Sequence, residues 1–230
     1  MSNSDLVNAY ASVRSSLITF YYATNIFIGY IRLINPAFHG IRFLLGKNVV
    51  CAYTKTETYN INNADGIQSQ SINTIIFNNF INSGDDCVVF KAGQGQSVAN
   101  FPPTQYGWVF NNYMREGHGV VVLEVKLVLG LRIYLLNVTV DNGNTATGGP
   151  MISVTGYSGQ DTSLGYPETF SKNVTFEDIK IIRARPANIS RLQDSLFKNI
   201  LIQDWGNFNS PWILNNTKNL KFINVQPMPN

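Results

Sequence analysis

The chain has 230 residues, of which only 13% are charged, and its formal net charge is +3. This length can bury a sizeable core, and we expect one domain over residues 1–230. No block of Lys or Arg is present, which argues against a nucleic-acid partner. Asn, Ile, Val, Phe and Tyr are plentiful whereas Ala, Glu and Lys are not, so the composition favours strands over helices.

The first 31 residues carry apolar stretches that are interrupted by Thr, Asn, Gly and Tyr. No positively charged region precedes an apolar core, and no small-residue cleavage site follows, so a signal peptide is not expected. The apolar stretches are also too broken to span a bilayer. The sequence therefore predicts no contact with a membrane.

Short apolar strands that begin at an Asn recur along the chain, roughly two dozen residues apart in its first part. They start at Asn25, Asn48, Asn73, Asn173, Asn199 and Asn219. No helical period is sustained, so we predict an all-β solenoid of stacked strand-turn coils, a β-helix, rather than a sandwich joined by hairpins. An Asn repeated at one point of successive coils can bond the turn and stack on the next Asn, which gives these residues a structural role.

Alternation within the late repeats predicts which side chains face the core. The apolar positions with inward orientation are Val174, Phe176, Ile179 and Ile181. Cys51 and Cys87 make neither a disulfide framework nor a metal-binding spacing. Since Cys87 falls on a strand that should face inward, we expect it to be a buried free thiol.

Three polar stretches interrupt the predicted stack, at residues 92–106, 143–149 and 159–167. They are rich in Gly, Pro, Gln, Ser and Thr, as loops are. Loops carried on one rim of a rigid solenoid are the expected place for a binding cleft.

Three aspartates fall within two short turns, although charged residues are scarce. Asp65 precedes a glycine, and Asp85 and Asp86 follow one, in each case between two predicted strands. If one coil separates the two turns, the carboxyl groups lie close together and raise one another's pKa. One of them can then stay protonated as an acid while another is an ionised base. The alternative is that both are ordinary Asp-Gly and Gly-Asp turns.

Two further residues could complete such a site. His118 lies between two glycines at the end of a strand, one strand-turn element after Asp85 and Asp86. It could hold a carboxyl group in its working orientation, or it could be a plain turn residue. Arg132 has the planar guanidinium that binds a carboxylate at two points, but it could equally face solvent on a strand.

The order of these motifs resembles that of the polygalacturonases, glycoside hydrolase family 28. The four segments that carry the resemblance are Asn63-Ala64-Asp65, Gly84-Asp85-Asp86, Gly117-His118-Gly119 and Arg132-Ile133-Tyr134. Residues 14–43 look like the family's approach to the first motif. Residues 173–230, with Ser210-Pro211-Trp212, look like the closing coils of its bacterial-type, exo-acting branch.

The resemblance implies a single-stranded right-handed parallel β-helix that cleaves the α-1,4 linkages of polygalacturonate with inversion. Asp85 would protonate the leaving glycosidic oxygen, Asp65 and Asp86 would activate water on the opposite face, and His118 would support the acid. Inverting glycosidases place acid and base roughly 6.5–9.5 Å apart so that a water fits between them. Carboxyl groups on adjacent coils, about 4.8 Å apart and diagonally placed, can meet that separation.

The same resemblance implies substrate-binding roles for Arg132, Tyr157 and Lys91. Arg132 would grip the galacturonate carboxylate, and Tyr157 matches a family tyrosine near the cleavage subsite. The partner would be a polysaccharide, with no metal and no cofactor, and the protein would be a monomer that acts outside the cell.

The chain also departs from the family pattern. Ala64 replaces a threonine, Tyr134 replaces a substrate-gripping lysine, and the segment between His118 and Arg132 is about one coil short. The family's signal sequence and first coils are absent, so we expect an N-terminally shortened β-helix. A non-catalytic relative that only binds galacturonan is therefore an alternative. A β-helix pectate lyase is a third, which would need a calcium site and a basic proton abstractor.

Overall fold

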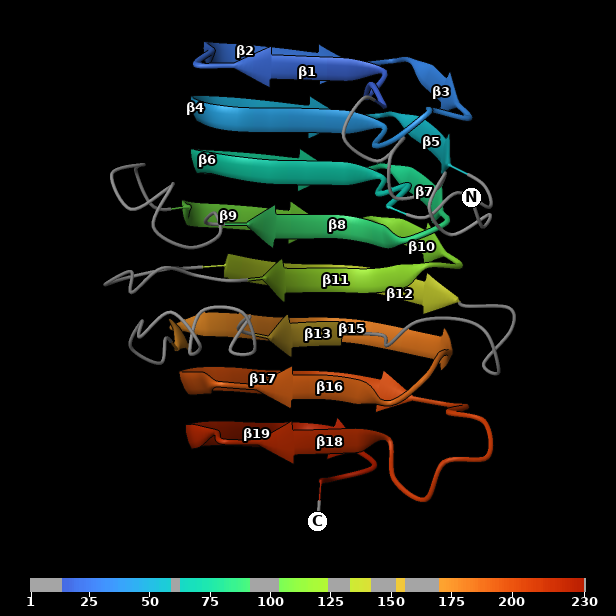
Figure 1. Ribbon diagram of the computed structural model, residues 1–230. Helices are drawn as coiled ribbons and strands as arrows, with labels where there is room; N and C mark the ends of the chain where they lie inside the picture. Colours follow the sequence, from blue (N-terminus) through green and yellow to red (C-terminus); the bar gives the residue numbers. More distant parts are fainter. Residues whose placement is uncertain are drawn as a thin grey trace, which may run out of the picture.

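The computed structural model describes residues 14–58, 63–91, 104–123, 133–141, 152–155 and 170–229. These residues contain no helix, and therefore none that could cross a membrane. Their strands pair into one sheet of 19 strands (Figure 1). The strands are β1 (Ile18–Tyr21), β2 (Thr24–Gly29), β3 (Arg32–Ile34), β4 (Ile41–Ala52), β5 (Lys55–Thr58), β6 (Ile67–Phe77), β7 (Phe80–Ser83), β8 (Asp86–Lys91), β9 (Gln105–Phe110), β10 (Tyr113–Arg115), β11 (His118–Leu123), β12 (Ile133–Asp141), β13 (Ile152–Thr155), β14 (Ser171–Lys172), β15 (Val174–Arg183), β16 (Ala187–Ser190), β17 (Leu192–Ile202), β18 (Trp212–Asn215) and β19 (Lys218–Gln226).

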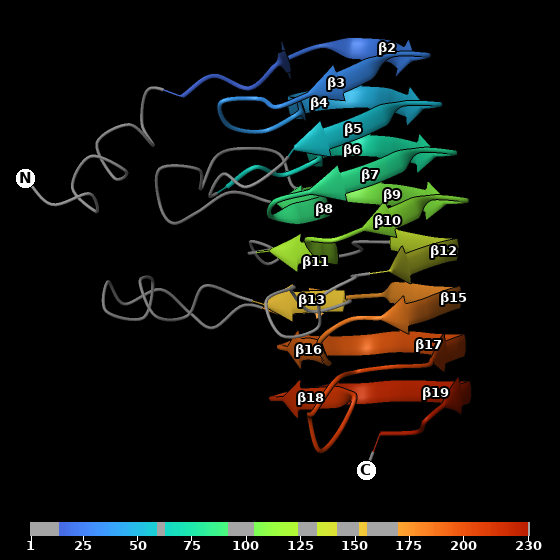
Figure 2. The same ribbon diagram turned by 90° about the vertical axis from the view of Figure 1, so that its right-hand side faces the viewer.

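Every pairing is parallel, and the strands stack on three faces of a solenoid (Figures 1 and 2). The first face runs β1–β4–β6–β8–β11–β13–β16–β18. The second runs β2–β4–β6–β9–β12–β15–β17–β19. The third, shorter face runs β3–β5–β7–β10 and continues into the C-terminal parts of β12 and β15. The parallel β-solenoid predicted from the sequence is confirmed.

The core lies inside the coils and is built from side chains stacked in register. On the first face, Ile41 pairs with Ile67, Ile67 with Val88 and Val88 with Val120. All four are at most 1% exposed. Because each coil repeats the same inward positions, burial in one coil is completed by the coils above and below it.

The expected inward positions of the late repeat are confirmed. Val174, Phe176 and Ile181 are fully buried and Ile179 is 2% exposed. Phe176 also stacks on Phe197, and Phe197 on Phe222, with ring centroids 4.6 and 4.9 Å apart. Cys87 is buried and free, as predicted.

The Asn repeats form a ladder on the outside of the second face. The Asn48 amide donates to Asn25, and the Asn73 amide donates to Asn48, each at 2.8 Å. All three residues have left-handed backbones, with φ between 56° and 61°. Asn tolerates that conformation better than most residues. Each repeated Asn therefore forms the turn of its own coil and also bonds to the Asn of the next coil.

The late repeats use the same device with mixed partners. Asn199 donates to Asp178 and accepts from Asn224, and Asn219 donates to Asp194. A second, buried ladder links Asn79 to Asn112 at 2.9 Å. The structural role predicted for the repeated Asn residues is thus confirmed where these bonds are made.

The predicted loops fall mostly outside the described residues. The first was placed at residues 92–106, but Gln105 and Tyr106 already belong to β9. The predicted loops at 143–149 and 159–167 lie wholly outside the described part of the chain.

Candidate active site

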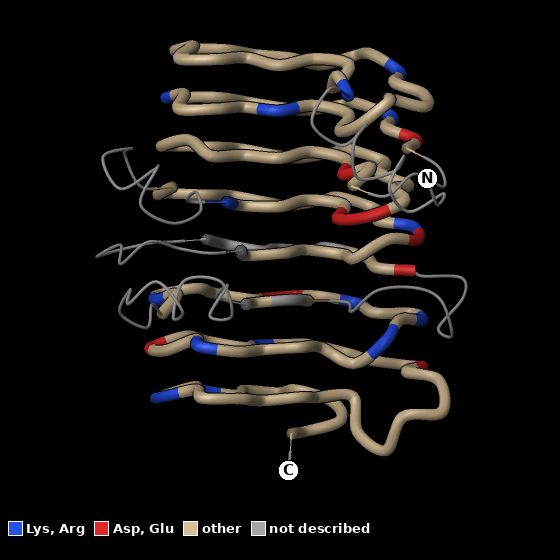
Figure 3. The backbone as a smooth tube through the Cα atoms, viewed as in Figure 1, with Lys and Arg blue, Asp and Glu red and all other residues tan. Residues whose placement is uncertain are grey.

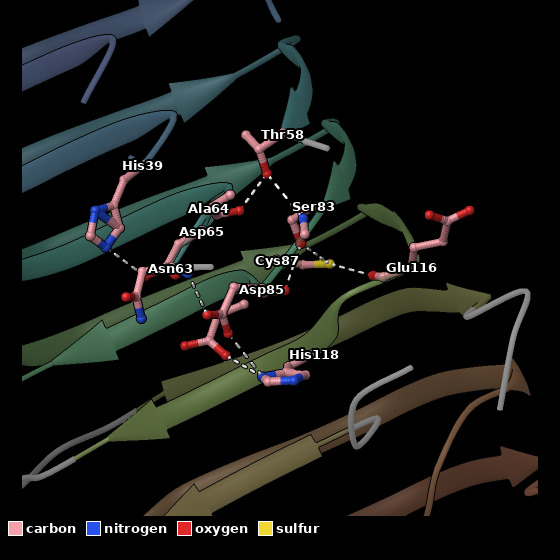
Figure 4. Close-up of polar contacts among 12 residues, drawn as sticks. His39, Thr58, Asn63, Ala64, Asp65, Ser83, Asp85, Cys87, Glu116 and His118 are labelled. Carbon is pink, nitrogen blue, oxygen red and sulfur yellow. Dashed lines mark hydrogen bonds and ion pairs between the residues drawn. The ribbon is translucent and has the colours of Figure 1, made fainter. Parts of the chain in front are cut away.

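The three sequence motifs meet where the chain passes from the third face to the first. Asp65 precedes β6, Asp85 lies in the turn between β7 and β8, and Asp86 begins β8. His118 begins β11, not the end of a strand as predicted from the sequence. Figure 3 shows acidic positions along this side of the coils, and Figure 4 shows the side chains.

The register places these residues in one column. His118 pairs directly with Asp86. Because Ile67 pairs with Val88, two residues further along each strand, Asp65 lies level with Asp86 on the preceding coil. The amide of Gly66 donates to the carbonyl of Asp86 at 2.7 Å, which fixes that level. Asp65, Asp86 and His118 therefore belong to three successive coils.

Two glycines of the motifs are required by close packing. A side chain at Gly66 would bring a Cβ within 2.6 Å of the Cys87 carbonyl oxygen. Gly117 has φ +71°, and a Cβ there would lie 2.3 Å from the Asp85 carbonyl oxygen. Both glycines let neighbouring coils approach where the carboxyl groups are presented.

His118 bridges the two adjacent aspartates. Its Nδ1 lies 2.8 Å from Oδ1 of Asp86 and 3.2 Å from Oδ1 of Asp85. The other carboxyl oxygen of Asp85 accepts a bond from the backbone amide of Asn63 at 3.0 Å. Side-chain exposure is 19% for Asp85, 8% for Asp86 and 3% for Asp65. Asp85 is thus the carboxyl group most accessible to a ligand.

Asp65 has a different environment. Its Oδ2 lies 2.9 Å from Nε2 of His39, whose side chain is also 3% exposed, and 3.6 Å from Nζ of Lys91. The ring and the carboxyl group are close but not aligned for a hydrogen bond, and neither atom has another hydrogen-bond partner. The carboxyl group is thus buried and incompletely paired.

These surroundings shift the proton affinities of the site. Burial raises the pKa of Asp65 to about 8, although the charge of Lys91 opposes the rise. Burial and then the neighbouring Asp86 raise the pKa of Asp85. The bond to Asp86 raises the pKa of His118, which keeps its imidazole charged to higher pH. Perturbed groups of this kind, gathered in one place, are typical of an active site.

A second layer of hydrogen bonds holds the turns beneath the carboxyl groups. Thr58 donates to the Ala64 carbonyl and accepts from the amide of Gly84. Ser83 donates to the Asp85 carbonyl at 2.8 Å, and the Cys87 thiol lies 3.1 Å from the Glu116 carbonyl oxygen. The bond from Thr58 uses only the backbone of residue 64, so the alanine found there keeps this contact.

Of the three predicted substrate-binding residues, only Lys91 lies in the described part of the chain. Lys91 reaches Asp65 with its ammonium group, so it contacts the candidate acid/base set itself. Arg132 and Tyr157 lie outside the described residues. The strand after Arg132, β12, pairs with β9 and β15 on the second face, whereas β13 continues the first face from β11.

His39 was not predicted as a site residue. Only Gly40 separates His39 from β4. Because Ile41 pairs with Ile67, His39 occupies the same column as Asp65, one coil earlier. A signal for it exists in the sequence. The first-face strands begin His39-Gly40-Ile41, Asp65-Gly66-Ile67, Asp86-Cys87-Val88 and His118-Gly119-Val120, each a titratable residue, a small residue and a β-branched one.

One group among the described residues has the spacing of a cation site. Ligand atoms of Asp85, Asp86 and His118 all lie within 4.8 Å of one another. The atom of His118 that would bind a cation is Nδ1, which also contacts Asp86. While Nδ1 carries a proton and donates it to Asp86 in a hydrogen bond, it has no lone pair for a cation. We assign no ion to it.

A separate hollow of about 500 Å³ lies on the third face and is lined by Phe80, Tyr113, Arg115, Asp141, Ile182 and Arg183. Phe80 and Tyr113 stack on each other with centroids 5.6 Å apart, and Lys55 covers the Phe80 ring. Both faces of the Phe80 ring and one face of the Tyr113 ring are therefore occupied.

Comparisons with known proteins identify the family. Residues 8–181 match the glycosyl hydrolases family 28. The chain is 30% identical to an exo-poly-α-D-galacturonosidase of Dickeya chrysanthemi, in an alignment that covers 94% of the chain and 46% of the relative.

Solved structures show the same fold. A family 28 exopolygalacturonase of Yersinia enterocolitica is 28% identical, with a TM-score of 0.55, over 90% of this chain and 47% of that one. An endo-xylogalacturonan hydrolase of Aspergillus tubingensis superposes with a TM-score of 0.73 at 18% identity, over 96% of this chain and 64% of that one. The chain spans about half the length of the exo-acting relatives.

Proposed function

Because the chain belongs to glycosyl hydrolases family 28, we propose that it cleaves α-1,4-galacturonosyl linkages of polygalacturonate with inversion of configuration. The observation that supports this most is the convergence of three carboxyl groups and a histidine from separate motifs in one column of the solenoid. Two carboxyl groups in the roles of acid and base are what this reaction requires.

Asp85 is the proposed acid. It is the most exposed of the three carboxyl groups, and its raised pKa favours the protonated form that the acid needs before reaction. Its proton passes to the glycosidic oxygen as the bond from that oxygen to the anomeric carbon breaks. The backbone amide of Asn63 and the imidazole of His118 then stabilise the carboxylate that remains.

Asp65 and Asp86 are proposed to hold the attacking water. The water oxygen bonds to the anomeric carbon from the opposite side, and one carboxylate takes the water proton. Asp86 is held by Nδ1 of His118. Below about pH 8 the buried Asp65 carries a proton, so its hydroxyl donates a hydrogen bond to the water. Asp86 is then the acceptor.

The proposal is tested by release of reducing ends from polygalacturonate by the purified chain and by its Asp85→Asn variant. Loss of the acid should lower kcat by roughly 10²–10⁴-fold, since that is the usual contribution of a positioned general acid. Asp204→Asn, an exposed carboxylate on a late coil, is the matched control and should keep full activity. An active Asp85→Asn variant would contradict the assignment.

Two alternatives give different results in the same assay. A lyase forms an unsaturated product that absorbs ultraviolet light, whereas a hydrolase releases only saturated ends. A relative that binds without cleaving would show no new ends but would retain affinity for galacturonan. An inverting hydrolase should release the β-anomer first, as proton NMR can detect.

A further inference from the structure

The column of titratable groups extends one coil beyond the proposed acid/base set. His39 lies level with Asp65, as Asp65 lies level with Asp86 and Asp86 with His118. The amide of Gly40 donates to the Asp65 carbonyl at 2.8 Å, which locks the two coils at this level. Figure 4 shows the imidazole directed at the Asp65 carboxyl group.

We propose that His39 is a positioning residue that holds the carboxyl group of Asp65 through Nε2 during the reaction. The proposal rests on the function proposed above, in which Asp65 binds the attacking water. Its basis is geometric: Nε2 and Oδ2 are 2.9 Å apart, both side chains are 3% exposed, and neither atom has another hydrogen-bond partner.

A buried polar atom without a partner costs roughly 1–3 kcal/mol, so this pair gains by aligning. A small rotation of the ring is enough, because the distance is already that of a hydrogen bond. The Phe38 ring packs edge-on against His39 with centroids 3.7 Å apart, which limits the ring to a narrow range of orientations.

Burial, and then the cations around it, keep His39 neutral. Burial lowers the pKa of His39 to about 3, and the cations of Arg42, Lys91 and Arg14 act in the same direction. A neutral imidazole has one N–H, and when Asp65 is ionised that proton is best placed on Nε2. When Asp65 is protonated, its hydroxyl can instead donate to Nε2, and the imidazole proton moves to Nδ1.

The pair therefore exchanges donor and acceptor roles as Asp65 gains or loses its proton. Several charged groups face Asp65 from the elements packed against it: Lys91 favours its ionised form, Asp86 and Asp85 oppose it, and Arg42 and His118 also interact with its charge. An N–H from His39 adds to the effect of Lys91. Removing that donor should favour the protonated form of Asp65 and weaken the hold on its carboxyl group.

The kinetic test compares His39→Leu with His39→Gln, whose side-chain amide can replace the N–H at Nε2. Misplacement of a catalytic group commonly costs up to about 100-fold, so His39→Leu should lower kcat by ~10- to 100-fold with little change in KM. The alkaline limb of its kcat–pH profile should move to higher pH, because Asp65 keeps the proton that it donates towards the water. His39→Gln should restore most of kcat. Wild-type kinetics in His39→Leu, or equal loss in both variants, would overturn the proposal.

A second readout does not depend on activity. The chain has two histidines, so ring ¹⁵N signals are assigned by comparing the wild type with His39→Leu. In Asp65→Asn the Nε2 signal of His39 should shift, whereas in Cys51→Ala, a buried core change on the next strand, it should not. Unchanged His39 signals in folded Asp65→Asn would overturn the pairing. If the wild type does not cleave polygalacturonate, the proposed function fails, while this spectrum still decides the contact.

Discussion

Two columns of stacked side chains run along the same solenoid, and they differ in whether their members satisfy one another. In the late coils, Phe176, Phe197 and Phe222 stack face to face inside the core. In the early and middle coils, His39, Asp65, Asp86 and His118 stack at the turn into the first face. Stacked rings gain favourable contacts from such repetition, whereas stacked carboxyl groups repel one another and lose their hydration.

The difference shows how one architecture serves both stability and chemistry. Parallel register places like positions about 4.8 Å apart whatever the side chain is. A residue that packs well on its own kind makes that spacing a source of stability. When the repeated residue is titratable, the same spacing shifts the proton affinity of its neighbours. The well-packed coils hold these titratable groups in place. Backbone register is common to both columns, so the comparison can be tested by single substitutions.

The largest effect is expected in the aromatic column. Phe197→Ala removes the middle ring, which also packs edge-on against Trp212. Truncation of a buried Phe usually costs about 3–5 kcal/mol through lost burial and a residual cavity. Urea unfolding measures this, and Phe208→Ala, whose ring is 41% exposed, is the control with a much smaller cost. A cost for Phe197→Ala no greater than the control would show that the column does not stabilise the fold.

The titratable column should respond in the opposite direction. Asp65→Asn removes a buried carboxyl group whose pKa is raised to about 8. The variant should therefore be more stable near pH 8, with a free energy of unfolding about 1–3 kcal/mol higher than that of the wild type. Between about pH 4 and pH 8 the folded wild type holds a proton that its unfolded chain has released. Wild-type stability therefore falls as pH rises through that window.

The measurement is urea unfolding of both proteins at pH 5 and pH 8. The gain in Asp65→Asn should be larger at pH 8. Asp204→Asn changes a half-exposed carboxylate and should alter stability by less than about 1 kcal/mol at either pH. A gain that is equal at both pH values would mean that ionisation of Asp65 carries no cost in the folded state.

The smallest effect is expected in the Asn ladder, which is polar yet satisfies itself. Asn48→Gly removes the bonds to Asn25 and Asn73 but suits the left-handed backbone, so it should cost about 1 kcal/mol. Asn48→Ala also places a Cβ in that conformation and should cost about 1 kcal/mol more. Thermal or urea unfolding would separate the two contributions. Equal costs would show that the backbone conformation at Asn48 is not limiting.

Much of the fold could be predicted because its signals are local and repeated. The Asn at each turn and the alternation of apolar residues such as Phe176 and Ile181 are visible within one coil, and the structure confirms both. The convergence of Asp65 with Asp85 and Asp86 also followed from the sequence, because it needed only the assumption that one coil separates the two turns.

The rest depended on register, which single motifs do not specify. His39 was missed because a lone histidine before a glycine has no meaning until Ile41 is paired with Ile67. Lys91 was predicted to bind substrate, but its position in the sequence does not show that its ammonium group lies 3.6 Å from Oδ2 of Asp65. The proposed roles of Arg132 and Tyr157 stay predictions, since both residues lie outside the described part of the chain.

The intervals between His39, Asp65, Asp86 and His118 are unequal in sequence, yet each spans one coil of the fold. The unequal lengths are taken up between strands, for instance by the residues between β8 and β9. Insertions and deletions at such points leave the column intact, whereas one residue added inside β6 or β8 would turn alternate side chains inside out. Evolution of this scaffold can therefore vary the rim of the site freely while its acid/base spacing is inherited unchanged.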